Sequence, residues 1–153
     1  MTGPDKPTTD AGYLEAASRI IFMGGLNRRV VDGKWDGFLQ AFHGFDVAAV
    51  AAMGPAEVDQ LTQDDRVIKY QAKLQAVVTN AQEMQQVAAE HGSFGAWVES
   101  AVAAGVPAAC AELSKRFAYI SRDGARNWLY STGHDVGAVT DKVREKYAPY
   151  RPA

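Results

Sequence analysis

Residues 64–90 read DDRVIKYQAKLQAVVTNAQEMQQVAAE and form the longest stretch of helical periodicity in the chain. Apolar residues recur there at intervals of three and four, as on the buried face of an amphipathic helix. They are Val67, Ile68, Leu74, Val77, Val78, Ala81, Met84, Val87 and Ala88. Gly92 suits the C′ position that ends a helix, and Ser93 suits the N-cap of the next one. The stretch therefore predicts a long buried helix followed at once by another.

The rest of the chain predicts shorter helices on short loops. They are expected from Ala11 with Asp10 as N-cap, over 34–44, over 47–53 with Asp46 as N-cap, from Pro55, over 107–113, over 122–132 and over 136–147. No alternating run is long enough for a strand, and no repeat is present. Residues 1–9, with two prolines, are expected to form a flexible tail. Residues 10–153 are expected to form a single, compact all-α domain.

Composition limits the class of protein. Of 153 residues, 47% are hydrophobic and 22% are charged, which suits a globular domain with its own core and argues against disorder. No apolar run reaches the roughly 18 residues of a membrane-spanning helix, and the first ten residues lack the apolar region of a signal peptide. We therefore expect a cytoplasmic protein that does not bind membranes. A single cysteine, Cys110, excludes an internal disulfide and any multi-cysteine metal site.

Charge is distributed unevenly along the chain. Residues 1–114 hold 8 Lys and Arg against 14 Asp and Glu, whereas residues 115–153 hold 8 against 4. The simple explanation is solubility, and the functional one is a basic end that contacts an anionic polymer such as DNA. Both explanations stay open on charge alone.

Motifs of metal or nucleophile chemistry are missing. His43, His91 and His134 are scattered without ligand spacing, so each is expected at the surface or in a loop and no metal is predicted. The chain has no nucleophile elbow and no phosphate-binding glycine loop. By themselves these residues indicate only a soluble helical domain.

Residues 24–99 resemble the DNA-3-methyladenine glycosylase I family of the helix-hairpin-helix DNA glycosylase superfamily. The resemblance is carried by Gly25-Leu26, by GFLQAFHGFDVAAVAAMGPAEVDQL, by DDRVIKYQAKLQAVVTNAQ and by Gly92-Ser93-Phe94 with Trp97. It implies the helix-hairpin-helix glycosylase fold. It also implies removal of a damaged base from double-stranded DNA in base-excision repair.

The chain departs from this family at several functional positions. It lacks the cysteines of the family's zinc site, so we expect a divergent member without metal or cofactor. The family's pocket glutamate falls at Ile20, and a pocket aromatic falls at Arg28. Because these two base-reading residues differ, 3-methyladenine is not carried over as the substrate. An isoleucine at position 20 favours a neutral or bulky base over a cationic one.

The C-terminal part, FAYISRDGARNWLYSTGHDVGAVTDKV, resembles the hairpin and following helix of the wider superfamily. This resemblance places Asp141 at the catalytic aspartate, and it places Asp123 where strand-cleaving members have a lysine. We therefore expect a monofunctional hydrolase. The Gly-apolar-Gly of the hairpin, whose N–H groups bind phosphate, is matched to Ser121-Arg122-Asp123-Gly124, with one glycine left. Asp141 equally suits the start of the last helix, since Thr140-Asp141 precedes KVREKY.

Such an enzyme must take the base out of the stack before it can reach the glycosidic bond. A carboxylate beside the sugar then stabilises the positive charge that develops there. The residues expected to contact DNA are Arg122, Gly124, Arg126, Lys142, Lys69 and Lys73, the last two on one face of the long helix. The residues expected at the base pocket are Ile20, Met23, Tyr70 and Trp128. The alternatives are solvated charges for the basic residues and a core position for Trp35, Trp97 and Trp128.

Two readings of function stay open. The first is a DNA glycosylase acting on a damaged, possibly alkylated, base. The second is a non-catalytic relative that binds DNA or another ligand through the inherited cleft, which the lost pocket glutamate and hairpin glycines favour. The lesion, the opposite-base preference and the oligomeric state are not determined by the sequence.

Overall fold

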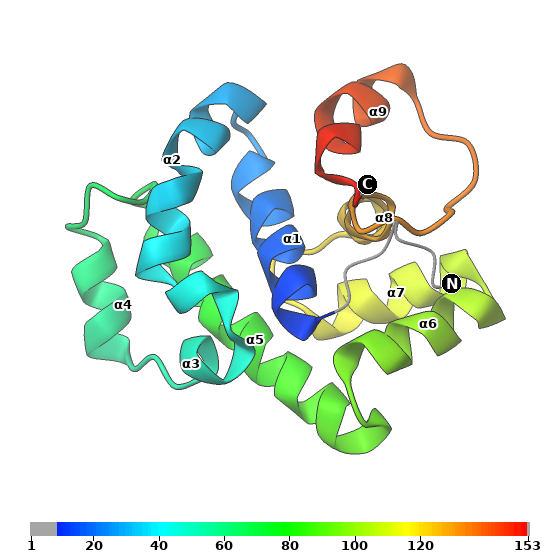
Figure 1. Cartoon of the computed structure of the whole chain (residues 1–153), viewed down its shortest axis with the longest axis horizontal. Coiled ribbons are helices and arrows are strands. Elements are labelled where there is room, and N and C mark those ends of the chain that lie inside the picture. Colours follow the sequence, from blue (N-terminus) through cyan, green and yellow to red (C-terminus); the bar gives the residue numbers. More distant parts are fainter. Residues whose placement is uncertain (1–8, 153) are drawn as a thin grey trace.

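The computed structural model describes residues 9–152 and consists of helices joined by short loops (Figure 1). The helices are α1 (Asp10–Met23), α2 (Arg28–Ala41), η1 (His43–Phe45), α3 (Val47–Ala51), α4 (Pro55–Leu61), α5 (Gln71–His91), α6 (Phe94–Ala104), α7 (Val106–Arg116), α8 (Arg122–Ser131), α9 (Asp141–Tyr147) and η2 (Ala148–Tyr150). The described residues contain no strand, which confirms the all-α prediction. The predicted tail lies outside this part of the chain except for Thr9. None of the helices within 9–152 combines the length and apolarity needed to cross a bilayer.

Helix α1 lies at the centre, with α2 to α4 on one side, α6 to α8 on the other and α5 packed against it (Figure 1). Two aromatic clusters fill the core on either side of α1. One contains Phe22 of α1 with Trp35, Phe38, Phe42 and Phe45. The other contains Tyr13 of α1 with Phe94, Phe117 and Trp128. Because α1 contributes to both clusters, its surface is fixed relative to both halves of the molecule.

Several predicted helix boundaries are confirmed. Asp46 accepts a hydrogen bond from Ala49 N at the start of α3, and Pro55 is the first residue of α4. Gly92 ends α5 with a φ of 93°, and the Ser93 hydroxyl accepts from Ala96 N at the start of α6. Each residue satisfies backbone groups that a helix end leaves unpaired.

The prediction that Asp10 caps the first helix is wrong. Thr9 is the N-cap of α1, and its hydroxyl accepts a hydrogen bond from Gly12 N. The Asp10 carboxylate instead accepts hydrogen bonds from Phe94 N and Gly95 N, at 2.9 and 3.0 Å. Asp10 therefore caps α6, 84 residues away, and ties the start of α1 to it.

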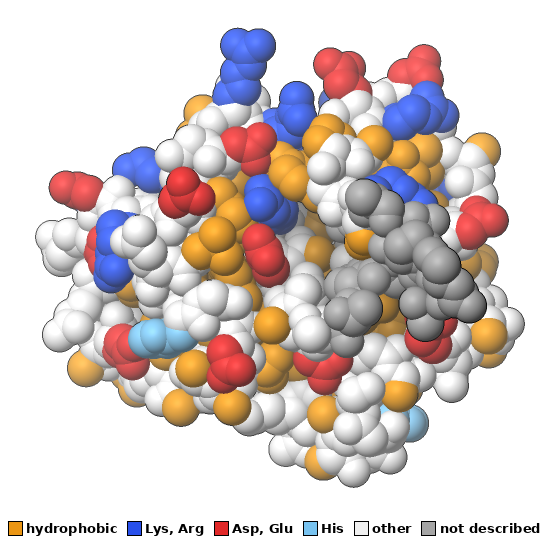
Figure 2. Space-filling view, in the orientation of Figure 1, with side chains coloured by type: hydrophobic (Ala, Val, Ile, Leu, Met, Phe, Trp, Pro, Cys, Tyr) orange, Lys and Arg blue, Asp and Glu red, His pale blue; other side chains and the backbone are white. Residues whose placement is uncertain are grey.

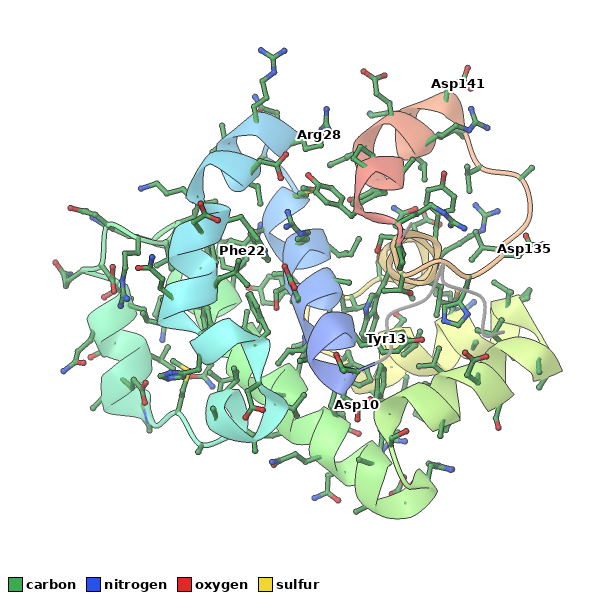
Figure 3. All side chains as sticks on the ribbon, in the orientation of Figure 1. Asp10, Tyr13, Phe22, Arg28, Asp135 and Asp141 are labelled. Carbon is green, nitrogen blue, oxygen red and sulfur yellow. The ribbon has the colours of Figure 1, made fainter. Side chains whose placement is uncertain are left out.

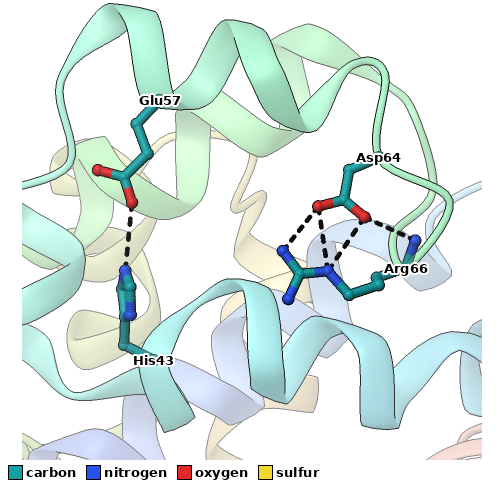
Figure 4. Close-up of polar contacts among 4 residues, drawn as sticks. All are labelled: His43, Glu57, Asp64 and Arg66. Atoms are coloured by element: carbon teal, nitrogen blue, oxygen red, sulfur yellow. Dashed lines mark hydrogen bonds and ion pairs between the residues drawn. The ribbon is translucent and has the colours of Figure 1, made fainter.

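The long helix begins at Gln71 rather than at residue 64. The Asp64 side chain accepts hydrogen bonds from the backbone N–H and the guanidinium of Arg66, so residues 64–66 form a turn (Figure 4). Hydrogen bonding by Arg66 also holds the pKa of Asp64 below its usual value. Val67 is buried as the periodicity predicted, but it belongs to this turn and not to the helix.

A left-handed turn joins α2 to α3. His43, Gly44 and Phe45 all have positive φ, a conformation that costs energy for the two residues with a side chain. The Phe45 ring stacks on Trp35 and Phe42, and His43 Nε2 lies 3.2 Å from Glu57 Oε2 of α4 (Figure 4). Burial of Phe45 in the aromatic cluster offsets the strain of this turn.

The last helix begins at Asp141 rather than at residue 136. Gly137 has a φ of 85°, and the Arg126 guanidinium donates hydrogen bonds to the carbonyls of Val136 and Ala138. These carbonyls are therefore not available to a helix, and α9 starts only where Thr140 can cap it.

His134 is buried, which corrects its expected surface position. It lies in the loop after α8, with its Nε2 2.8 Å from the Tyr13 hydroxyl and its ring stacked on Tyr13. Burial raises the pKa of Tyr13. His43 and His91 are exposed, as predicted. Trp35 and Trp128 are core residues, whereas Trp97 is only half-buried, against Phe94.

Candidate functional site

A cavity of about 300 Å³ lies between α1, the end of α8, the end of α9 and the C-terminal segment that follows α9. Its lining residues are Gly12, Glu15, Ala16, Arg19, Ile20, Ser131, Thr132, Tyr147, Tyr150 and Pro152. This volume is at the lower end of those that hold small organic ligands. We call this cavity the α1 pocket.

Glu15 is the carboxylate of the α1 pocket. Its Oε2 accepts a hydrogen bond of 2.9 Å from the indole N–H of Trp35 and lies 3.6 Å from the Arg19 guanidinium. Its Oε1 has no hydrogen-bond partner among residues 9–152. The side chain is 33% exposed, so the fixed carboxylate keeps one oxygen open to the pocket.

Arg19 connects α1 to α2 and to the C-terminal segment. Its guanidinium lies between the rings of Trp35 and Tyr150, 4.3 Å from each ring centre. It also donates a 3.1 Å hydrogen bond to Asp32 Oδ1, the atom that accepts a 2.6 Å hydrogen bond from the Tyr150 hydroxyl. Stacking on both faces and this shared carboxylate fix the guanidinium in one orientation.

The C-terminal segment is held at several further points. The Arg151 guanidinium stacks over the Tyr130 ring and donates hydrogen bonds to the Tyr130 and Gly133 carbonyls. Lys146 donates a hydrogen bond of 3.0 Å to the carbonyl of Met23 at the end of α1. These contacts make Tyr147 and Tyr150 a fixed wall of the α1 pocket.

The hydrogen bond between Tyr150 and Asp32 predicts a loss of stability at alkaline pH. Burial and this hydrogen bond raise the pKa of Tyr150. The folded chain therefore holds the phenol proton more tightly than the unfolded chain does. The resulting stability is complete below pH of about 10, the usual tyrosine pKa, and is lost as the pH rises through the raised value.

We expect urea unfolding of the wild type to show a drop in free energy from pH of about 9 to about 11, and Tyr150→Phe to show a smaller drop. The exposed Tyr119 provides a control, since Tyr119→Phe should keep the wild-type dependence. Equal drops in the wild type and Tyr150→Phe would show that the hydrogen bond to Asp32 contributes nothing.

The end of α8 lines the α1 pocket with two hydroxyl groups whose protons are already donated. Ser131 donates to the carbonyl of Trp128, and Thr132 donates to the carbonyls of Trp128 and Leu129. Toward a ligand these hydroxyl oxygens can therefore act as acceptors rather than as donors.

Of the four residues predicted for a base pocket, Ile20 lies in the lining of the α1 pocket. Trp128 does not, because it is 1% exposed, stacks on Phe94 and donates its indole N–H to the carbonyl of Tyr13. Met23 is also fully buried. Tyr70 is exposed just before α5, with its ring 5.2 Å from Lys73 Nζ. The structure therefore separates these four residues, and it corrects the position of Trp128 from the cleft to the core.

Asp141 lies outside the α1 pocket. It is the first residue of α9, its side chain is 98% exposed, and it forms an ion pair of 2.6 Å with Arg144. Figure 3 shows it at the outer end of α9, whereas Tyr147 at the other end of this helix lines the pocket. This geometry is that of an acidic residue stabilising a helix start.

The hairpin differs in register from the prediction. Arg122, Asp123 and Gly124 lie inside α8, and the turn between α7 and α8 consists of residues 117–121. Tyr119 has a positive φ of 60°, Ile120 is buried and Ser121 caps α8. Tyr119, Ile120 and Ser121 thus form the end of this turn, directly before the residues matched to the hairpin motif. Asn80 of α5 holds this turn through two hydrogen bonds to the backbone of Ala118.

The predicted DNA contacts lie on three helices and on the turn before α5. Lys73 is in α5 and donates to the carbonyl of Gly24, whereas Lys69 precedes this helix and pairs with Asp65, so the two lysines do not share a helix face. Arg122 is exposed at the start of α8, and Lys142 is exposed on α9. Arg126 holds the loop after α8 instead of facing solvent freely.

The Lys and Arg side chains that one face shows nevertheless gather in one half of it. In Figure 2 they lie in the upper half, among Asp and Glu side chains, whereas the charged types of the lower half are Asp, Glu and His. Lys73 and Lys146 both donate to carbonyls at the end of α1, and burial lowers the pKa of each. Within residues 9–152 no group of three or more His, Cys, Asp or Glu side chains could hold a metal ion.

Comparison with known proteins identifies the family. The family model of methyladenine glycosylase matches residues 14–121. The chain belongs to this family. The match begins within α1, includes Glu15, Arg19 and Ile20 of the pocket, and ends at the cap of α8. The C-terminal segment that completes the pocket lies outside the matched residues.

Individual relatives agree with the family match. The DNA-3-methyladenine glycosylase 1 of Escherichia coli (strain K12) is 36% identical over 63 residues, 41% of this chain and 34% of the relative. The chain thus matches about a third of the length of its curated relatives. A 3-methyladenine DNA glycosylase I from Staphylococcus aureus superposes with a TM-score of 0.76 at 18% identity, over 84% of this chain and 78% of the other. A variant 3-methyladenine DNA glycosylase I in complex with 3-methyladenine superposes with a TM-score of 0.72 at 20% identity, over 95% of this chain and 88% of the other. These superpositions support the predicted glycosylase fold.

Proposed function

We propose that this protein is a DNA glycosylase that hydrolyses the bond between a damaged base and its sugar in double-stranded DNA. The observation that carries the proposal is the α1 pocket, because it contains Ile20, the position at which the family resemblance places the base pocket. Membership of the methyladenine glycosylase family supports the same activity. A cytoplasmic location is part of this proposal, since the substrate would be chromosomal DNA.

The pocket has the features that extraction of a base requires. It is large enough for a single nucleobase, and Ile20, Ala16 and the Tyr147 ring provide apolar surface for a flat ligand. A base bound there must have left the stack, because the walls enclose it on more than one side. The Lys and Arg side chains in the upper half of the face in Figure 2 support contact with the phosphates around the extruded nucleotide.

The part of Asp141 in this reaction remains a prediction. Its exposure and its pairing with Arg144 argue for a local role at the start of α9. We therefore expect Asp141→Asn to keep most of the base-release activity. A loss of about a thousandfold or more would instead establish Asp141 as the catalytic carboxylate.

The proposed function is tested by base release under single-turnover conditions at low salt, from duplexes carrying one alkylated, oxidised or deaminated base. We expect release from at least one duplex. Ala16→Leu, which fills the α1 pocket, should abolish it and also controls for contaminating enzymes. An absence of release from every duplex by the wild type would contradict the proposal. Salt-dependent DNA binding without release would favour the non-catalytic relative, to which the position of Asp141 outside the pocket also points.

A further inference from the structure

We propose that Glu15 is the specificity residue of the α1 pocket and accepts a hydrogen bond from the amino group of the extruded base. This inference rests on the proposed function for the identity of the ligand. It assigns base recognition to a position other than residue 20, where the family resemblance places the pocket glutamate and this chain has isoleucine.

The carboxylate of Glu15 is oriented before any ligand arrives. The indole N–H of the buried Trp35 donates a hydrogen bond of 2.9 Å to Oε2, and the Arg19 guanidinium lies 3.6 Å from the same oxygen. Glu15 lines the pocket, and with Oε2 held its other oxygen, Oε1, has no partner among residues 9–152. A pre-oriented acceptor loses little conformational entropy on binding.

The surrounding groups favour a ligand that donates hydrogen bonds. Ser131 and Thr132 line the pocket, and their hydroxyl protons are donated to carbonyls of α8, which leaves only lone pairs for a ligand. Arg19 has ion-pair contacts with Asp32 and Glu15, and aromatic rings cover both faces of its guanidinium. A base with an exocyclic amino group, such as an adenine derivative, complements these acceptors. A base with a carbonyl oxygen at the same position would face the Glu15 carboxylate unfavourably.

The packing of α1 explains why the carboxylate lies at position 15 rather than 20. A methyl group added at Gly124 of α8 would lie 3.5 Å from Ile20 Cγ2, so residue 20 packs closely against the start of α8. Only 7% of Ile20 is exposed, and a carboxylate there would lose most of its hydration. Glu15 is more open to solvent and has the Trp35 N–H as a partner.

The test measures binding of two free bases by isothermal titration calorimetry. The probes are 3-methyladenine, which has an amino group, and hypoxanthine, which has a carbonyl oxygen in its place. Glu15→Gln keeps the size of the side chain and an acceptor for Trp35, but removes the charge and adds an amide donor. Glu57→Gln on α4 is the matched control, because it makes the same change in an exposed carboxylate of another region, which contacts His43.

We expect the wild type and Glu57→Gln to bind 3-methyladenine at least tenfold more tightly than hypoxanthine. Glu15→Gln should bind 3-methyladenine at least tenfold more weakly than the wild type, with no loss for hypoxanthine. Thermal melting verifies that this variant is folded. If it is not, Ala16→Leu should abolish binding of 3-methyladenine, and retained binding would exclude the α1 pocket as the site.

Three results would overturn the inference: no binding of 3-methyladenine to the wild type, equal affinity of the wild type and Glu15→Gln, or an equal loss for both probes. The outcome is separate from that of the proposed function. Base release from DNA that Glu15→Gln leaves unchanged would contradict the role of Glu15 and leave the activity standing. If Glu15→Gln selectively loses 3-methyladenine binding but the wild type releases no base from DNA, the role of Glu15 stands and the proposed activity is contradicted.

Discussion

Replacing Trp128 with alanine is expected to lower the free energy of unfolding by about 4 kcal/mol. The indole is fully buried, stacks on Phe94, meets the edge of Phe117 and donates its N–H to the Tyr13 carbonyl. Truncation would leave a large cavity between α6, α8 and the start of α1, and it would leave a buried carbonyl without its donor. Urea unfolding at neutral pH measures the change directly.

Trp97→Ala is the matched control for this prediction. Trp97 is half-buried and contacts Phe94 from the edge of the same cluster, so its loss should cost about half as much or less. Equal and small effects of both substitutions would contradict the placement of Trp128 in the core. Such a result would instead support the prediction that Trp128 is an aromatic residue at the cleft.

Replacing Gly37 with alanine is expected to lower the free energy of unfolding by about 3 kcal/mol. A Cβ atom at Gly37 would lie 2.0 Å from the carbonyl oxygen of Arg66 and 2.7 Å from its carbonyl carbon. Both are backbone atoms of the turn that precedes α5, which the Asp64 side chain and Val67 hold in place. The substitution must therefore move α2 away from this turn or break the turn itself.

Gly33→Ala in the same helix is the control, because a Cβ there meets nothing within 4 Å. Alanine in an open helical position should stabilise the protein by up to about 1 kcal/mol. Chemical denaturation of both variants should therefore give changes of opposite sign. Stabilisation by both substitutions would show that α2 does not pack against the turn at Arg66.

The sequence predicted the fold where the signal is local. Asp46, Pro55, Gly92 and Ser93 act on neighbouring backbone groups, so their roles follow from residue type and spacing. The predicted starts of α5 and α9 failed because side chains compete for the backbone. The Asp64 side chain accepts a backbone hydrogen bond that forms a turn before α5. Arg126 donates hydrogen bonds to carbonyls that would have to pair within a longer α9. Asp10 failed as a local cap because its partners lie on α6.

The candidate site was less predictable because it combines distant segments. Glu15 and Arg19 are four residues apart and resemble an ordinary surface ion pair on α1. Their role depends on Trp35, 20 residues away, and on Tyr150, which reaches Asp32 from 118 residues away. The only signal in the sequence was that Glu15 and Arg19 are the two charged residues in a predicted helix whose other positions from 13 to 23 are mostly apolar. The turn with Tyr119 was also not predicted, because the residues matched to the hairpin motif, 122–124, lie in α8 and not in the turn.

A base held in the α1 pocket, completed by the C-terminal segment, must perturb the backbone around it. Titration of isotopically labelled protein with 3-methyladenine, followed by the backbone amide resonances in NMR spectra, measures this perturbation. We expect the largest shifts at Glu15, Ala16, Thr132 and Tyr150, with Asp141 unchanged. Saturable shifts confined to another surface, with these pocket resonances unmoved, would contradict binding of the base in the α1 pocket.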